Sequence, residues 1–219
     1  MNLLLINGPS RCGKDTLADM ICENTDGSQI VSMADPLKRA THRLYEAFNR
    51  QRALGYPADF FETCKDDPND FFFGLSPRQA YIAVSEIYAK TMHGQSFFGE
   101  IFAKEVQEAP KNARLIICSD AGFMDEALPP VELVGIENVT VVHLSRKGCR
   151  FPNAGQTWRE TLAYCIRRAL PFFHYMKEIR DSRQHVEIDG ARTLEISNDC
   201  TLAELDEKAQ WIARVCDPR

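Results

Sequence analysis

The chain has 219 residues, of which 44% are hydrophobic and 26% are charged, and its formal net charge at pH 7 is -5. This length suits one domain, or one core with insertions, and the apolar share is sufficient for a sizeable core. The acidic balance argues against a nucleic-acid-binding surface, and no apolar run approaches the roughly 18 residues that a membrane span needs.

The first residues and the cysteines indicate where the protein resides. The stretch before residue 7 is too short and too uncharged at its start for a signal peptide, so we expect a cytoplasmic protein. The eight cysteines are scattered without a Cys-x-x-Cys pair, which favours reduced and mostly buried thiols over disulfides. The five histidines show no metal-ligand spacing along the sequence.

The N-terminal stretch Gly8–Thr16 reads Gly-Pro-Ser-Arg-Cys-Gly-Lys-Asp-Thr. It follows a short apolar run, residues 3–6, that predicts a buried strand, and it precedes apolar residues spaced like the inner face of a helix. A glycine-bounded loop between a strand and a helix is typical of phosphate binding. Glycine allows the backbone N–H groups to approach a diphosphate, the helix N-terminus adds partial positive charge, and Lys14 adds a full charge.

The loop is therefore predicted to bind the phosphates of a nucleotide. The predicted nucleotide-binding residues are Gly8, Ser10, Arg11, Cys12, Gly13, Lys14, Asp15 and Thr16.

Asp15 departs from the common pattern, because a serine or threonine usually follows the lysine and supplies the hydroxyl that holds Mg²⁺. A carboxylate beside a triphosphate is repelled unless a cation lies between them. Asp15 therefore favours a bound Mg²⁺, held directly or through water, with Thr16 as the next oxygen ligand. The alternative is that Asp15 is an ordinary acid in the first helical turn.

The remaining elements follow an alternating pattern of strands and helices. Further strands are predicted at 29–33, 114–118, 139–144, 184–188 and 193–196, with an Asp189-Gly190 turn between the last two. Helices are predicted at 15–23, 36–50, from Pro77 behind a Ser76 cap, at 97–108, and from a Thr201 cap to about 215. The helix at 36–50 is expected to turn Leu37, Ala40, Leu44 and Ala47 inward.

Residues 55–76 are predicted to form a long loop in which acidic residues alternate with phenylalanines. Two interpretations of the phenylalanines are open, namely packing under the loop and base stacking. Packing is the commoner use of such residues in a long excursion.

Two segments carry a family resemblance. Val31-Ser32-x-Ala34-Asp35-x-Leu37-Lys38 is similar to the segment after strand two of nucleoside monophosphate kinases. The loop spelled Gly-Lys-Asp-Thr, followed by Ala-Asp-Pro-Leu-Lys, resembles more specifically the phage-type deoxynucleoside monophosphate kinases. The resemblance implies that Lys38 contacts the acceptor phosphate, helped by Arg39, and that Asp35 lies beside the acceptor. Asp35 as a helix cap and Lys38 as a solvated charge remain the alternatives.

Other parts of the chain resemble this family with changes. Arg78 follows a proline as in the phage-type kinases, which implies an acceptor-site arginine. Residues 84–86 read Val-Ser-Glu where the family has a Gly-Thr-Glu-type stretch, and Gly122 stands where the family has an arginine. The acceptor is therefore left open among phosphorylated small molecules.

Three further positions are candidates for the site. Asp120 ends the strand at 114–118, where ligands gather in an open α/β sheet, and is predicted to serve Mg²⁺ directly or from the second shell. Arg146 and Arg150 follow the strand at 139–144, where the family begins a mobile lid, and would offset charge on the transferring group. Residues 198–202 resemble an Asn-Asp-x-[Ser/Thr]-Leu stretch near the end of the phage-type kinases, which implies that Asn198 lies near the donor adenine. The alternative for Asp120 and Asn198 is turn chemistry.

Together these features predict a three-layer α/β fold with a parallel sheet of about five strands. The resemblance implies a P-loop kinase fold in which strand one is central. Residues 36–110 would form an acceptor-binding region and about 147–185 a lid, within a single domain of residues 1–219. The expected activity is ATP-dependent, Mg²⁺-assisted phosphoryl transfer to a (deoxy)nucleoside monophosphate. The expected partners are nucleotides, without nucleic acid or membrane, and the protein would be a monomer or homodimer. The alternatives are a kinase of another phosphorylated metabolite and a non-catalytic nucleotide-binding protein.

Overall fold

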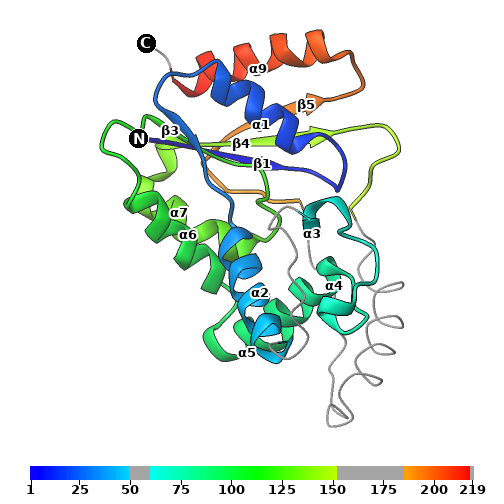
Figure 1. The fold of residues 1–219 in the computed structure, drawn as a ribbon. Coiled ribbons are helices and arrows are strands. Elements are labelled where there is room, and N and C mark those ends of the chain that lie inside the picture. Colours follow the sequence, from blue (N-terminus) through cyan, green and yellow to red (C-terminus); the bar gives the residue numbers. More distant parts are fainter. Residues whose placement is uncertain (50–59, 152–184, 218–219) are drawn as a thin grey trace. The chain divides into compact units, whose positions relative to one another are not determined.

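The computed structural model describes residues 1–49, 60–151 and 185–217 (Figure 1). The described residues form two compact units. The first unit comprises residues 1–34, 95–151 and 185–217, and the second comprises 35–49 and 60–94. Most of the predicted lid therefore lies outside the described residues.

The first unit is built on a five-stranded sheet in the order β2-β3-β1-β4-β5, with every neighbouring pair parallel. The strands are β1 (Asn2–Asn7), β2 (Ser28–Ile30), β3 (Leu115–Cys118), β4 (Val139–Ser145) and β5 (Arg192–Ser197). The central strand β1 places Leu5 between Cys118 of β3 and Val141 of β4. The predicted α/β fold with a five-stranded parallel sheet and a central first strand is confirmed.

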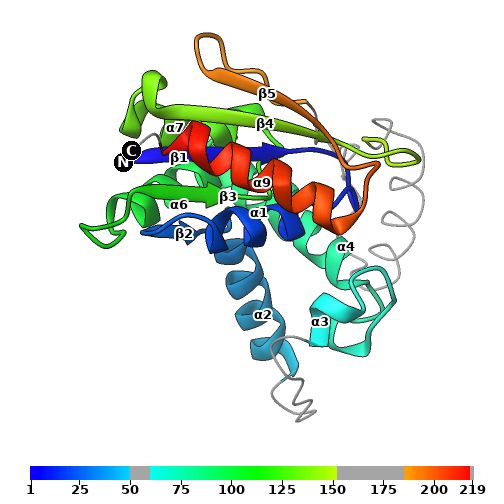
Figure 2. The ribbon, with the colours of Figure 1, turned by 90° about the horizontal axis from the view of Figure 1, so that it is seen from above.

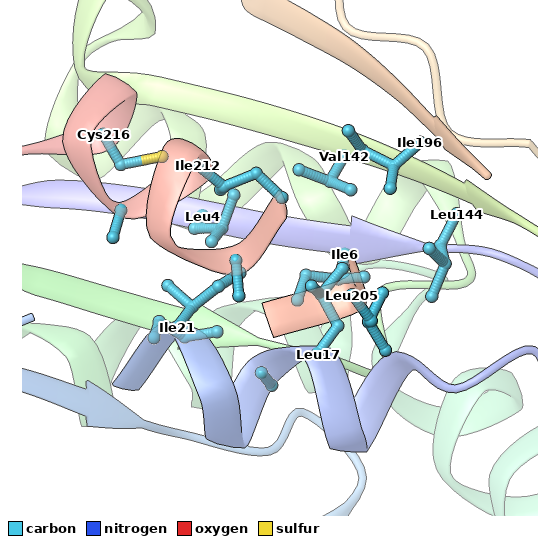
Figure 3. Packing of buried hydrophobic residues seen from close by; sticks show 14 of the residues in the cluster. Leu4, Ile6, Leu17, Ile21, Val142, Leu144, Ile196, Leu205, Ile212 and Cys216 are labelled. Atoms are coloured by element: carbon cyan, nitrogen blue, oxygen red, sulfur yellow. The ribbon is translucent and has the colours of Figure 1, made fainter. Parts of the chain in front are cut away.

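Helices cover both faces of this sheet (Figures 1 and 2). One face carries α1 (Lys14–Glu23) and α9 (Leu202–Cys216), and the other carries α6 (Phe97–Gln107) and α7 (Met124–Val134). Leu4 and Ile6 pack with the first pair of helices (Figure 3), whereas Leu3 and Leu5 pack in the core on the other face. Because both faces are buried, each central strand is a continuous apolar run, as the sequence indicated.

The last helix begins as predicted. Thr201 caps α9, since its hydroxyl accepts the backbone N–H of Glu204 while the Glu204 side chain accepts the backbone N–H of Thr201. This reciprocal capping box satisfies two N–H groups that a helix start otherwise leaves without partners.

The sequence analysis did not predict α7, which contains Pro129 and Pro130. Proline in a helix removes an N–H, so Pro130 donates no hydrogen bond to the carbonyl of Glu126 four residues earlier. Gly99 of α6 lies against that carbonyl, where a Cβ would come within 2.2 Å of the oxygen. The two helices therefore approach closely at a point where one lacks a side chain and the other lacks an internal hydrogen bond.

The strand predicted at 184–188 is not formed at residues 185–188, which join no ladder of the sheet. The prediction was wrong because the polar groups of this segment have other partners. The N–H of Val186 donates to Oδ1 of Asn7, and the carbonyl of Val186 pairs with the imidazole of His143. The predicted turn at Asp189-Gly190 is present and is closed by the N–H of Ala191.

The second unit consists of helices and turns. Its elements are α2 (Asp35–Asn49), α3 (Phe60–Thr63), the 3₁₀ turn Asp70–Phe72, α4 (Pro77–Ile82), a π-helical segment (Ala83–Ala89) and α5 (Lys90–His93). The predicted cap at Ser76 is confirmed, because its hydroxyl accepts the N–H of Gln79, whose side chain accepts the N–H of Ser76.

Phenylalanines form the core of this unit. Phe61, Phe71 and Phe72 are 3%, 3% and 0% exposed and pack with Leu75 and Ala80. Their ring centroids lie 4.9 to 5.1 Å apart. The interpretation of these residues as packing, and not as a stacking surface, is therefore confirmed.

The predicted inner face of α2 was wrong. Leu44 is 43% exposed and Ala40 and Ala47 are exposed, whereas Thr41 and Asn49 are buried. The buried face was missed because it is polar and aromatic. The Asn49 amide nitrogen donates to the carbonyl of Phe71 in the core, whereas the Asn49 amide oxygen and the Thr41 hydroxyl are buried without a hydrogen-bond partner among the described residues. Within the described residues, no helix combines the length and apolar character needed to cross a membrane.

Candidate functional site

The loop between β1 and α1 has the backbone shape of an anion-binding nest. Arg11 and Gly13 have positive φ values of 64° and 97°, and the N–H of Cys12 bonds back to the carbonyl of Pro9 at 3.4 Å. The residue that caps α1 is Gly13, which has no side chain to satisfy the N–H groups of the first turn. Such a helix start offers both N–H donors and partial positive charge to an anion.

Both glycines of the loop are required by close approaches. A Cβ on Gly8 would lie 2.4 Å from the carbonyl oxygen of Leu144 in β4, and one on Gly13 would lie 2.4 Å from Nδ2 of Asn198. The same Nδ2 donates to the carbonyl of Cys12 at 2.8 Å. Asn198, predicted as an adenine contact, therefore holds the loop from the end of β5, and its contact with adenine stays a prediction.

Lys14 reaches back over the loop. Its ammonium donates to the carbonyl oxygens of Gly8 at 2.9 Å and Pro9 at 2.8 Å. These two contacts hold the charge at the start of the loop, while the N–H groups of α1 lie at its end. The loop thus carries a full positive charge and a set of N–H donors within one turn of chain.

Asp15 and Thr16 are exposed in the first turn of α1. The hydroxyl of Ser119, which follows β3, donates to Oδ1 of Asp15 at 2.7 Å. A carboxylate and two hydroxyls are therefore present at the carboxyl ends of β1 and β3. Mg²⁺ prefers such oxygen ligands, so the donor set fits this ion.

Asp120 is occupied by four donors. Its Oδ2 accepts from the hydroxyl of Ser32 and the N–H of Ala34, and its Oδ1 accepts from the N–H of Met33 and the thiol of Cys118, at 2.7 to 3.1 Å. Direct coordination of Mg²⁺ would displace at least one of them. Asp120 therefore fits better as a group that serves Mg²⁺ from the second shell than as a direct ligand. In that role its carboxylate holds the backbone that follows β2.

Two thiols lie near these groups and titrate above their ordinary range. Burial raises the pKa of Cys118 well above its usual value, and the neighbouring Asp120 carboxylate adds to the effect. Burial also raises the pKa of Cys12, although Lys14 acts in the opposite direction. Both thiols are therefore protonated at neutral pH, which suits packing and weak hydrogen bonding instead of nucleophilic chemistry.

Arg146 and Arg150 lie in the chain that follows β4, and both side chains are exposed. The turn between them is closed by the N–H of Cys149, which donates to the carbonyl of Arg146 at 3.0 Å. The N–H of Lys147 donates to Asp199 at 2.6 Å, which fixes the start of this turn next to the end of β5. Residues 152–184 of the predicted lid lie outside the described residues.

In the second unit, Lys38 is held between two carboxylates. Its ammonium lies 3.0 Å from Glu62 and 3.3 Å from Asp35. Burial alone would lower the pKa of Lys38, but the two carboxylates outweigh it and raise the pKa above its ordinary value. Burial likewise opposes ionisation of Glu62, whose pKa is nonetheless lowered by Lys65 and Lys38. Lys38 is therefore an ion-paired and partly buried cation, and not a solvated charge on the helix surface.

Arg78 is held in the same way by the segment after α3. Its Nε donates to Asp66 at 2.7 Å, and its backbone N–H donates to the carbonyl of Lys65 at 3.0 Å. Residues 62–66 therefore bring the two predicted acceptor-site cations, Lys38 and Arg78, to one segment of chain. Arg39, the third predicted cation, is exposed on α2.

Sequence reasoning missed several polar groups of this unit. It gave Glu62 and Asp66 no role beyond alternation with phenylalanine, although both pair with cations. It also missed Lys90, whose side chain is 2% exposed and lies 2.8 Å from Glu86. For the ion pair of Glu86 and Lys90, the only signal in the sequence was their i,i+4 spacing.

No protein-family model and no curated protein sequence matches the chain. Three solved structures illustrate its similarity to known folds. A gluconokinase from Sinorhizobium meliloti 1021 is 14% identical, with 98% of this chain and 93% of that chain covered and a TM-score of 0.41. A sugar kinase from Janibacter sp. HTCC2649 is 13% identical, with 99% and 96% covered and a TM-score of 0.42. The thymidylate kinase from Candida albicans is 10% identical, with 98% and 91% covered and a TM-score of 0.41.

Proposed function

We propose that the protein catalyses ATP-dependent phosphorylation of a (deoxy)nucleoside monophosphate, giving the diphosphate. The observation that carries this proposal is the loop after β1. It combines a left-handed Gly13, an uncapped helix start and an ammonium group held over the loop by two carbonyls. Few ligands other than a polyphosphate use all three features at once.

At the donor, Lys14 would exchange the carbonyls of Gly8 and Pro9 for phosphate oxygens. The exchange is favourable because a charged acceptor makes a stronger hydrogen bond with an ammonium group than a neutral carbonyl does. The N–H groups of the loop and of the first turn of α1 would receive the β-phosphate. Asn198 keeps the loop in the shape that this requires through its bond to the Cys12 carbonyl.

Asp15 and Thr16 would hold Mg²⁺, with Ser119 positioning the carboxylate of Asp15. When bound, the ion would offset the negative charge of the nucleotide phosphates. Asp120 contributes by fixing the backbone of Met33 and Ala34 and does not itself need to be a ligand.

At the acceptor, Lys38 and Arg78 would bind the phosphate, with Asp35 and Arg39 as neighbours. A phosphate dianion would replace Glu62 and Asp66 as their partners, which keeps each cation paired in both states. An acceptor phosphate oxygen would attack the γ-phosphorus while the bond to the leaving ADP breaks. No general base is required, and Arg146 and Arg150 would offset charge on the group in transit.

An acceptor panel tests the proposal. The common ribo- and deoxyribonucleoside monophosphates and a set of phosphorylated sugars would be incubated with ATP and Mg²⁺. ADP and the phosphorylated product would both be measured, so that ATP hydrolysis is not mistaken for transfer. Nucleoside diphosphate is expected from one or more monophosphates. Turnover restricted to another metabolite, or ATP binding without any product, would reject the proposal in favour of one of its two rivals.

A matched pair of variants on α2 tests the acceptor assignment. Lys38→Gln is expected to raise the KM for the monophosphate at least about tenfold, since a charged hydrogen bond to phosphate is worth roughly 1.5–3 kcal/mol. Arg43→Gln removes an exposed charge from the same helix and is expected to leave that KM unchanged. Equal effects of the two variants would remove Lys38 from the acceptor site.

A further inference from the structure

Two histidines and a glutamate meet on the first unit, beside the carboxyl ends of β4 and β5. His143 lies on β4 opposite Glu195 of β5 in the register of the sheet. His185 lies in the segment before β5, with its ring centroid 3.7 Å from that of His143. One ligand atom from each residue lies within 4.8 Å of the other two. Their wide separation in sequence gave no metal-ligand spacing, so only the fold reveals the cluster.

We propose that His143, His185 and Glu195 form a binding site for a divalent transition-metal ion, with Zn²⁺ as the preferred ion. Two imidazole nitrogens and a carboxylate oxygen are a common protein donor set for Zn²⁺, with a water as the fourth ligand. Mg²⁺ prefers oxygen ligands, so this site differs in chemistry from the oxygen ligands at the start of α1.

The hydrogen bonds of His143 provide the strongest support. Its Nε2 faces the carbonyl oxygen of Val186 at 2.9 Å, and its Nδ1 faces Oε1 of Glu195 at 2.6 Å. Both partners are acceptors. When Nε2 carries the proton for Val186, the lone pair of Nδ1 points at a carboxylate, and either a proton or a cation must lie between them. An imidazole that donates one N–H to a carbonyl and turns its other nitrogen to an ion is the usual arrangement at metal sites.

The geometry of the cluster allows such an ion after small shifts. Metal–ligand bonds of about 2.0–2.1 Å in a tetrahedron separate the ligand atoms by roughly 3.3 Å. The contact between His143 and Glu195 would therefore lengthen while His185 moves closer. His143 is buried and fixed, whereas His185 and Glu195 are exposed and can adjust. Glu187 lies 3.8 Å from Nε2 of His185 and offers a further oxygen.

A bound ion would fasten residues 185–188 to the sheet. This segment joins no ladder, and its polar contacts to the sheet run from Val186 to His143 and to Asn7. Asn7 pairs with His143 in the register of β1 and β4 and directly precedes the phosphate loop. The ion would therefore act as a structural clamp beside the loop and not as part of the phosphoryl transfer.

Metal binding can be measured without reference to activity. Chelator-treated protein would be titrated with Zn²⁺ in a calorimeter in the absence of nucleotide. We expect one high-affinity ion per chain in the wild type and at least tenfold weaker binding in His185→Ala and in Glu195→Gln. Glu195→Gln keeps an acceptor for His143 while removing the charge. His93→Ala and Glu132→Gln, at exposed positions elsewhere, serve as matched controls and should bind like the wild type.

Replacing Zn²⁺ by Co²⁺ would reveal any binding to the cysteines. Thiolate ligands give a charge-transfer band in the near ultraviolet, whereas imidazole and carboxylate ligands do not. Zn²⁺ should also raise the melting temperature of the wild type but not of His185→Ala. Absence of a stoichiometric ion, equal affinity in all variants, or a thiolate band from the bound Co²⁺ would each overturn the proposal. In that event, the contact between His143 and Glu195 is an ordinary hydrogen bond between an imidazole and a carboxylate.

Discussion

The two units fix their candidate phosphate-binding groups by different means. In the first unit, Lys14 is placed by carbonyls five and six residues earlier in the chain and by the helix that it begins. In the second, Lys38 and Arg78 are placed by carboxylates on a different segment, residues 62–66. Local backbone geometry determines the first arrangement, and packing of the whole unit determines the second.

This difference has a consequence for how each arrangement fails. A substitution of Lys14 should alter phosphate binding and leave most of the first unit folded, because Lys14 belongs to neither hydrophobic core of the sheet, unlike Cys12 of the same loop. A substitution in the phenylalanine core should disturb Lys38 and Arg78 together, because α3 is placed by Phe61 and the other rings of that core. The following predictions test these expectations.

Phe72→Ala is expected to have the largest effect. Phe72 is completely buried among aromatic rings, and truncating such a side chain costs about 3–5 kcal/mol in the free energy of unfolding. Phe73→Ala is the control, because the ring of Phe73 is 42% exposed. Urea denaturation followed by circular dichroism would measure both. Similar losses for the two variants would contradict the phenylalanine core as described.

Lys14→Ala is expected to lower kcat by about 10²–10³-fold, which is the usual cost of removing one group that stabilises developing charge. The fold should be retained, because Lys14 belongs to neither hydrophobic core of the sheet and its ammonium donates to carbonyls of the loop itself. Lys111→Ala removes an exposed charge after α6 and should leave the rate unchanged. A fully active Lys14→Ala protein would remove the loop from the proposed mechanism.

The sequence predicted the first unit well for a physical reason. The glycine spacing, the apolar runs of β1, β3 and β4, and the Thr201 cap each act over a few residues, so their structural effect can be inferred locally. The parallel direction of the strands follows from the alternation of strands and helices, whereas the central place of β1 was implied by the family resemblance. The strand predicted at 184–188 is an exception with a clear cause, because the hydrogen-bond partners of Val186, Asn7 and His143, lie far away in the sequence.

The second unit was predicted poorly because its determinants are not periodic. The buried face of α2 carries Thr41 and Asn49, which an apolar pattern does not reveal. The pairing of Glu62 and Asp66 with cations depends on how the rings pack beneath them. In the first unit, helix α7 was missed because it contains two prolines, which have a low helix propensity. This helix packs closely against α6 at Gly99, a contact that the sequence pattern does not reveal.

Gly13→Ala separates the two reasons for glycine in the loop. A non-glycine residue with left-handed φ costs about 1–2 kcal/mol, and Gly148→Ala measures that cost alone, because its φ is 83° and no atom lies within 4 Å of its added Cβ. Gly13→Ala should cost about 0.5–1.5 kcal/mol more, since the amide of Asn198 must leave the Cys12 carbonyl.

The additional cost should disappear in an Asn198→Ala background, where no amide remains to be displaced. The free energies of unfolding of the wild type, Gly13→Ala and Gly148→Ala, each with and without Asn198→Ala, would show it. An unchanged difference between Gly13→Ala and Gly148→Ala in that background would mean that Asn198 does not hold the loop.

Glu62→Gln is expected to have the smallest effect and the most specific pH dependence. The carboxylate is 39% exposed and Lys38 is 28% exposed, so solvent screening limits the contribution of the pair to below about 1 kcal/mol. The pKa of Glu62 is lowered in the folded protein, so its stabilising effect is complete above its unfolded pKa of about 4.3 and is lost as the pH falls through the lower folded value. The wild type and Glu62→Gln should therefore differ in unfolding free energy at pH 6 and converge toward pH 3.

Glu132→Gln, at an exposed site on α7, should show no such convergence. A constant difference between wild type and Glu62→Gln over this range would mean that the glutamate acts through packing and not through its charge, and Lys38 would then lack the partner that the acceptor proposal assigns to it.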